Sequence, residues 1–190
     1  MKKILLLLII AMLSSAAFAA PFGLKMGMPI KEIEKFCEGK AEPLEKDAYL
    51  VKPQKSHPSF NKYYVFVDKK RGLYKIRAIT KLQKVNKYGT ELQSQFHDIK
   101  ERIAKTYGEP RIIDEIDRNS VFDKDEYWMY TLNDGARKLV AFWNESSSLS
   151  DNLNQVYLSC EANTAYTGYL LLEYEFKNAN KVEDEQDSVF

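Results

Sequence analysis

Residues with the chemistry of catalysis are few in this sequence, and their spacing matches no catalytic motif. His57 and His97 are forty residues apart, and neither lies in a His-Glu-x-x-His frame. The sequence contains no glycine-rich phosphate loop and no Gly-x-Ser-x-Gly elbow. A Cys/His or Ser/His nucleophile could use either histidine, but we interpret both as structural or exposed. We therefore assign no catalytic residue, no metal ligand and no cofactor.

Carboxylates are the second group with catalytic chemistry. Glycoside hydrolysis needs two acids about 5–10 Å apart in a cleft. Glu173 and Glu175 alternate with apolar residues, so they share one face of the last predicted strand. Glu126 and Glu161 also lie in predicted strands. With 27 acidic residues in the chain, such pairs arise by chance, so a solvated sheet face is our preferred interpretation and a cell-wall hydrolase the alternative.

Cys37 and Cys160 are the only cysteines, so a single intramolecular pairing exists. An exported chain meets an oxidising compartment, where an unpaired thiol is unfavourable. We therefore predict a Cys37–Cys160 disulfide, with two buried thiols as the alternative.

The first nineteen residues have the features of a secretory signal peptide. Lys2 and Lys3 precede an apolar run over residues 4–13, and Ala17-Phe18-Ala19 fits the small-x-small cleavage rule. The run is shorter than the roughly 20 residues of a membrane span, and we predict no span after the signal is removed. The expected location is the periplasm, or the medium.

Composition limits the class of protein. The chain has 190 residues, 45% of them hydrophobic, and 28 Lys and Arg against 27 Asp and Glu. This length and apolar content can build one ordinary domain. Near charge balance disfavours a general nucleic-acid binder.

Helical spacing appears in two places. Pro29 precedes Ile30, Ile33, Phe36 and Cys37, which predicts a short amphipathic helix. Thr90 and Gln93 have capping-box spacing, an apolar stripe continues to Tyr107, and Gly108 and Pro110 follow. We predict the longer helix over residues 90–107.

The remaining patterns predict strands. Alternation of apolar and polar residues predicts strands over the ranges 49–51, 63–67, 73–82, 111–117, 126–132, 138–144, 155–161 and 169–176. Asn133-Asp134-Gly135 indicates a turn between two of them. The order predicts an α+β fold with a mostly antiparallel sheet and two main helices packed on one face. We expect a signal peptide at 1–19, an exported domain at 20–176 with halves 20–85 and 86–176, and an acidic, disordered tail at 177–190.

A faint internal repeat adds to this expectation. Gly27-Met28, a helix and Glu42-Pro43 parallel Gly89-Thr90, a helix and Glu109-Pro110. The phrase from Phe22 to Pro29, continued by Ile30 and Ile33, resembles the helix-plus-sheet unit of the small outer-membrane assembly lipoproteins and of the tandem-unit β-lactamase inhibitor protein. The resemblance implies a non-enzymatic module that binds other proteins through its sheet face and loops, and a duplicated helix-plus-hairpin unit. The lipid-acceptor cysteine of the lipoproteins is missing, and no functional residue is carried over.

Charge and aromatic residues indicate where a partner could bind. Eight basic residues and no acid lie between Lys69 and Lys87, whereas six acids lie between Asp114 and Glu126. Lys75, Arg77 and Lys81 belong to the basic segment, which could dock an acidic partner or pair with the acids. Trp128, Tyr130 and Trp143 lie on adjacent predicted strands and are either an exposed contact surface or core.

These patterns together predict an exported, non-enzymatic protein-binding module of inhibitor or immunity type, whose partner is another envelope protein. The expected contact residues are Trp128, Tyr130, Trp143, Lys75, Arg77 and Lys81. The alternatives are the carboxylate-based hydrolase and a carrier of a small apolar ligand between helix 90–107 and the sheet.

Overall fold

The first half of the chain folds into short helical turns followed by an antiparallel set of strands. A computed structural model describes residues 20–144, 147 and 149–182; the predicted signal peptide lies outside the described residues. The elements of this half are η1 (Pro21–Gly23), α1 (Ile30–Ile33), η2 (Glu34–Phe36), β1 (Glu42–Pro43), β2 (Ala48–Val51), β3 (Phe60–Asp68), β4 (Gly72–Thr80) and β5 (Gln83–Lys84).

The second half begins with the long helix and ends with the two longest adjacent strands. Its elements are α2 (Thr90–Tyr107), β6 (Arg111–Ile116), η3 (Asp125–Tyr127), α3 (Trp128–Asp134), β7 (Arg137–Trp143), β8 (Leu153–Thr164) and β9 (Thr167–Phe176). The strands predicted at 49–51, 63–67, 73–82, 111–117, 138–144, 155–161 and 169–176 are confirmed, with boundaries shifted by a few residues.

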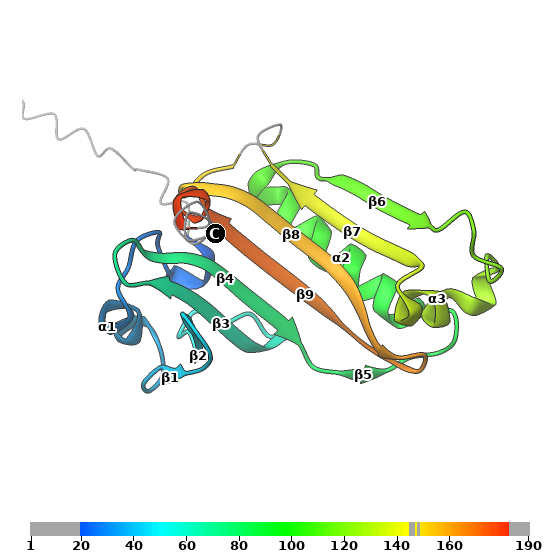
Figure 1. The fold of residues 1–190 in the computed structure, drawn as a ribbon, viewed down its shortest axis with the longest axis horizontal. Coiled ribbons are helices and arrows are strands. Elements are labelled where there is room, and N and C mark those ends of the chain that lie inside the picture. The colour runs from blue at the N-terminus through cyan, green and yellow to red at the C-terminus, as the bar shows by residue number, and fades with distance from the viewer. Residues whose placement is uncertain (1–19, 145–146, 148, 183–190) are drawn as a thin grey trace, which may run out of the picture.

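All nine strands of the described chain form one antiparallel sheet, which confirms the α+β class. The strand order is β1-β2-β3-β4-β9-β8-β7-β6, and β5 pairs with β9 (Figure 1). Strand β4 of the first half and β9, the last strand of the second half, are neighbours, with Arg77 opposite Glu173 and Ile76 opposite Tyr174. The sheet is therefore continuous across both halves of the chain.

Alternation along the strands gives the sheet an inner and an outer face. On the inner face, Leu172, Tyr174 and Phe176 of β9 join the core with the α2 residues. On the outer face, Glu173 and Glu175 alternate with them and are half-buried. In Figure 1, α2 runs behind β8 and β9, so the view is onto the outer face.

Helix α2 has the predicted bounds and buries the predicted stripe, Leu92, Phe96, Ile99, Ile103 and Tyr107. Its start differs from the prediction, because Gly89 is the N-cap and the Thr90–Gln93 capping box is not formed. Instead, Gln93 Nε2 donates to the Tyr88 carbonyl at 2.8 Å. Gly89 has φ 65°, and a Cβ there would lie 2.2 Å from the Trp128 ring. The position therefore requires glycine for both reasons.

The prediction of a strand over 126–132 is wrong. This segment forms the 3-10 turn η3 and helix α3, whose buried residues Trp128, Met129 and Leu132 have helical spacing. Gly135, with φ 81°, ends α3 and is not part of a hairpin turn. The large aromatic residues of this segment favour strands intrinsically, and packing on β7 and β8 overrides that preference.

The predicted disulfide is also wrong, since both cysteines are free and buried. Cys37 pairs with Pro53 beside β2, whereas Cys160 lies in β8, opposite Leu170 of β9. Strands β3, β4 and β9 lie between β2 and β8, so the separation is about 19 Å at the usual strand spacing. A disulfide needs Cα atoms about 4.4–6.8 Å apart.

Ordered structure continues past the predicted boundary at residue 176. A helical turn at 179–182 follows β9, and Ala179 and Val182 are buried against Tyr74. Asn178 Nδ2 also donates to the carbonyls of Arg71 and Leu73, at 3.1 and 3.0 Å. Residues 183–190 of the predicted tail lie outside the described residues.

Candidate functional site

The predicted contact residues do not form one surface, and the two basic residues of β4 are held by acids. Arg77 on the outer face donates from Nε and Nη2 to Glu173 Oε2, at 2.8 and 2.7 Å. Lys75 Nζ lies 3.5 Å from Glu173 and 3.8 Å from Glu175. Lys75 and Arg77 are therefore paired with acids of the neighbouring strand β9, whereas Lys87, at the end of the basic segment, pairs with Glu126 of the acidic segment.

Lys81 follows β4 and is exposed. It lines a shallow hollow of about 430 Å³ on the outer face, together with Lys62, Tyr64 and Tyr169. Lys81 is thus separated along β4 from the Arg77–Glu173 pair and remains accessible to a partner.

Trp128 and Trp143 are core residues in the structure. Trp143 is fully buried, and its Nε1 donates to the Gly108 carbonyl at 2.6 Å, which ties β7 to the end of α2. Trp128 is also buried, with the Arg137 guanidinium 6.0 Å from its ring. Of the two interpretations left open for these aromatic residues, core packing applies to both tryptophans.

Tyr130 is the predicted aromatic contact residue that lies at the surface, with 44% of its area exposed. Its ring centroid is 4.9 Å from that of Phe122, which is 5.1 Å from Tyr127. Val121, beside them in the connection from β6 to α3, is 82% exposed. We call Val121, Phe122, Tyr127 and Tyr130 the corner patch, since they lie where the β6–α3 connection meets α3 at one end of the molecule (Figure 1).

Local hydrogen bonds hold the corner patch in place. Asp117 N–H donates to the Ala136 carbonyl at 2.7 Å, and Met129 N–H donates to the Lys87 carbonyl at 3.1 Å. Lys87 Nζ also pairs with Glu126 at 3.3 Å, and this hydrogen bond raises the pKa of the Lys87 ammonium. Both ends of the patch are therefore fixed to the body of the fold.

Exposed carboxylates lie beside the corner patch in the sequence, together with the exposed cations Arg118 and Lys124. Asp117, Asp123 and Asp125 are exposed, and in the described part of the chain no Lys or Arg lies within ion-pair distance of them. Glu126 is shared with Lys87. The patch thus combines an apolar centre with a charged rim in which acids outnumber bases, a composition that favours a partner with apolar and basic side chains.

The four carboxylates considered for hydrolysis have structural neighbours in the fold. Glu161 accepts a hydrogen bond from Ser159 Oγ at 2.5 Å, and Glu126 pairs with Lys87. Glu173 and Glu175 lie on the outer face against Lys75 and Arg77. Each of the four carboxylates therefore has a neighbour within hydrogen-bond or ion-pair distance.

The two histidines occupy unrelated places. His97 is exposed on α2, with its ring 5.5 Å from Phe96, whereas His57 lines a pocket between the β2–β3 connection and α2. In the described ranges, no three His, Cys, Asp or Glu side chains gather as metal ligands would.

The sequence did not single out Val121, Phe122 or the pocket residue Arg102. The signal for the first two is an apolar pair, Val121-Phe122, inside an otherwise polar segment. Nothing in the local sequence distinguishes Arg102 as a binding residue, because it lies on the polar face of a predicted helix, where exposed cations are common.

Comparison with protein-family models, curated proteins and solved structures gives no match. Within the described residues, every helix is too short or too polar to span a bilayer. The resemblance to the lipoprotein and inhibitor units therefore stays a prediction.

Proposed function

We propose that this chain is an exported, non-enzymatic protein-binding module of the bacterial envelope, and that the corner patch is its contact surface. The observation that carries the proposal is the exposed side chain of Val121 beside aromatic rings in edge-to-face contact, with a predominantly acidic rim. Soluble proteins expose few such clusters without a binding role. The proposed partner is another envelope protein with a segment of apolar and basic residues.

The patch has the physical properties of a binding hot spot. Tyr130 and Tyr127 supply large, stiff side chains that lose little conformational entropy on binding. Phe122 lies between them, so their orientation is set before a partner arrives. The carboxylates of Asp123 and Asp125 would steer a basic partner and raise its association rate at low salt.

We also infer that the helices share the inner face and that the two halves are a duplicated unit. Ile33 of α1, Phe96 of α2 and Met129 of α3 all belong to one core cluster. Each half places a helix before a run of antiparallel strands, and β4 and β5 of the first half pair with β9 of the second. This arrangement supports the tandem organisation that the resemblance implies.

The test is capture of a partner by the tagged chain from cross-linked envelope extract, followed by binding measurements with that purified partner. We expect the double variant Val121→Asp, Tyr130→Ala to weaken binding at least about tenfold, which corresponds to about 1.4 kcal/mol. Ile112→Ala is the matched control, since Ile112 is another exposed apolar residue, on β6. The mass of the captured chain also reports whether it is cut after Ala19.

Two outcomes would overturn the proposal. One is a partner that binds the double variant and the chain with the same affinity. The other is the absence of any enriched partner, in which case the hydrolase and carrier alternatives regain priority. Salt should weaken the true interaction, because its electrostatic component is exposed.

A further inference from the structure

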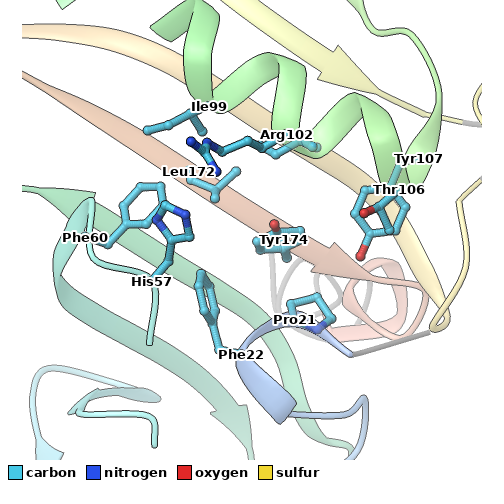
Figure 2. A pocket seen from close by; sticks show the side chains of 11 residues that line it. Pro21, Phe22, His57, Phe60, Ile99, Arg102, Thr106, Tyr107, Leu172 and Tyr174 are labelled. Carbon is cyan, nitrogen blue, oxygen red and sulfur yellow. The ribbon is translucent and has the colours of Figure 1, made fainter. Parts of the chain in front are cut away.

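A pocket of about 210 Å³ lies between α2 and the sheet, remote from the corner patch. Its walls are Phe22 of η1, Phe60 of β3, Ile103 of α2 and Leu172 of β9. Figure 2 shows these elements, which are far apart in the sequence, converging around one space. An apolar cavity of about 150 Å³ holds benzene, so this pocket can accept one aromatic ring with a short substituent.

One side of the pocket carries two hydrogen-bond donors. Arg102 and His57 both line it, and Figure 2 shows them on the same side. In the described part of the chain no carboxylate lies within ion-pair distance of Arg102. The guanidinium is therefore available for a bidentate contact with a carboxylate.

The backbone fixes the proton position on His57. Its Nδ1 accepts a hydrogen bond from the Ser59 N–H at 3.2 Å, so in the neutral imidazole Nε2 carries the hydrogen. Tyr63 holds the loop, because its hydroxyl accepts from the His57 N–H at 2.9 Å and donates to the His57 carbonyl at 3.0 Å. Burial, together with the charge of Arg102, lowers the pKa of His57, so His57 contributes a neutral donor.

Two tyrosine hydroxyls lie at the other side of the pocket. Burial raises the pKa of Tyr107 to about 12, and it raises the pKa of Tyr174 further. Both hydroxyls thus stay protonated at neutral pH. They could receive a polar substituent of a bound ring.

We infer that this pocket binds a small monocarboxylate carrying one aromatic ring. The carboxylate contacts Arg102 and His57 Nε2, and the ring packs against the contacting pair Phe22 and Phe60. This binding site goes beyond the proposed protein contact and is independent of it, because no residue of the corner patch lines the pocket.

The test is isothermal titration calorimetry of the purified chain with 3-phenylpropionate as the probe. We expect one site with a dissociation constant in the millimolar range or tighter, since so small a ligand gains limited total binding energy. Arg102→Gln should weaken binding about tenfold or more. Lys105→Gln is the matched control, as Lys105 is an exposed cation on α2 that does not line the pocket.

The alcohol 3-phenylpropan-1-ol, which has the ring but no charge, is the second comparison. We expect it to bind more weakly than the carboxylate to the unchanged chain, and equally weakly to Arg102→Gln. The inference is overturned if 3-phenylpropionate does not bind, if Arg102→Gln leaves its affinity unchanged, or if the alcohol binds as tightly as the carboxylate. Because Arg102 is exposed, its substitution leaves the core intact.

Discussion

Arg77 and Glu173 connect the two halves of the chain at the level of single side chains. They face each other across β4 and β9 in direct register, and the guanidinium lies 5.3 Å from the Phe66 ring. Such a half-buried, charge-assisted pair is stronger than an exposed one, because solvent screens it less. It stabilises the sheet where the halves meet.

A double-mutant cycle measures this contribution. We expect Arg77→Ala and Glu173→Ala to show a coupling energy of about 1 kcal/mol in urea unfolding. The exposed pair Lys52–Glu38 is the control, and its coupling should be about 0.3 kcal/mol or less. Equal coupling in the two cycles would contradict the assignment of Arg77 to a structural role.

Tyr107 should make the stability of the fold depend on alkaline pH. Its folded pKa of about 12 exceeds the value of about 10 in an unfolded chain, so its contribution is complete below pH 10. This contribution is lost as the pH rises toward 12, and the free energy of unfolding then falls by up to about 2 kcal/mol. Urea unfolding across this range should show the loss, and Tyr107→Phe should reduce it.

At the scale of elements, α2 and α3 differ in how far the sequence predicts them. Helix α2 has a long stripe of apolar residues at constant helical spacing and a glycine at each end, so its bounds follow from the sequence. Helix α3 is short, and its run from Tyr127 to Tyr130 consists of large side chains that fit a strand equally well. Contact with β7 and β8 selects the helix, and a local pattern contains no information about that contact.

The candidate site was likewise only partly predictable from local sequence patterns. Tyr130 was predicted as a contact residue and is exposed, whereas Trp128, two residues away, is buried because a helix places them on different faces. The pocket could be placed only roughly, between helix 90–107 and the sheet. Its donors Arg102 and His57 come from distant parts of the chain, and tertiary folding alone brings them together.

The junction of α2 and α3 depends on Gly89. We expect Gly89→Ala to destabilise the fold by about 3 kcal/mol, from left-handed backbone strain and from overlap with the Trp128 ring. Gly135→Ala introduces similar backbone strain, but no atom lies within 4 Å of the new Cβ. It should lower the free energy of unfolding by about 1 kcal/mol. Equal losses in thermal or urea unfolding would show that Trp128 does not pack against Gly89.

At the scale of the whole molecule, the continuous sheet accounts for the free thiols. The strand order separates Cys37, beside β2, from Cys160, on β8, so an oxidising environment would not join them. Counting cysteines could not reveal this, since strand order is a property of the complete fold. Burial raises the pKa of both thiols, which lowers their reactivity.

Alkylation checks the state of the two thiols. In denaturant without a reductant, we expect the mass of the chain to increase by two alkyl groups, because both thiols become accessible. The native chain should react slowly at both positions. A second sample treated with reductant before alkylation is the control, and labelling that occurs only in this sample would show that the cysteines are paired.

The central claim is that the corner patch contacts another protein, and site-specific photo-crosslinking in living cells tests it most directly. A benzophenone amino acid replaces Val121 in one strain and Ile112 in another, so that two exposed apolar positions are compared. We predict a discrete cross-linked protein from position 121 that is absent from position 112 and is lost when Asp123 and Asp125 are changed to Lys. Cross-linking from position 112 alone, or from neither position, would contradict the claim.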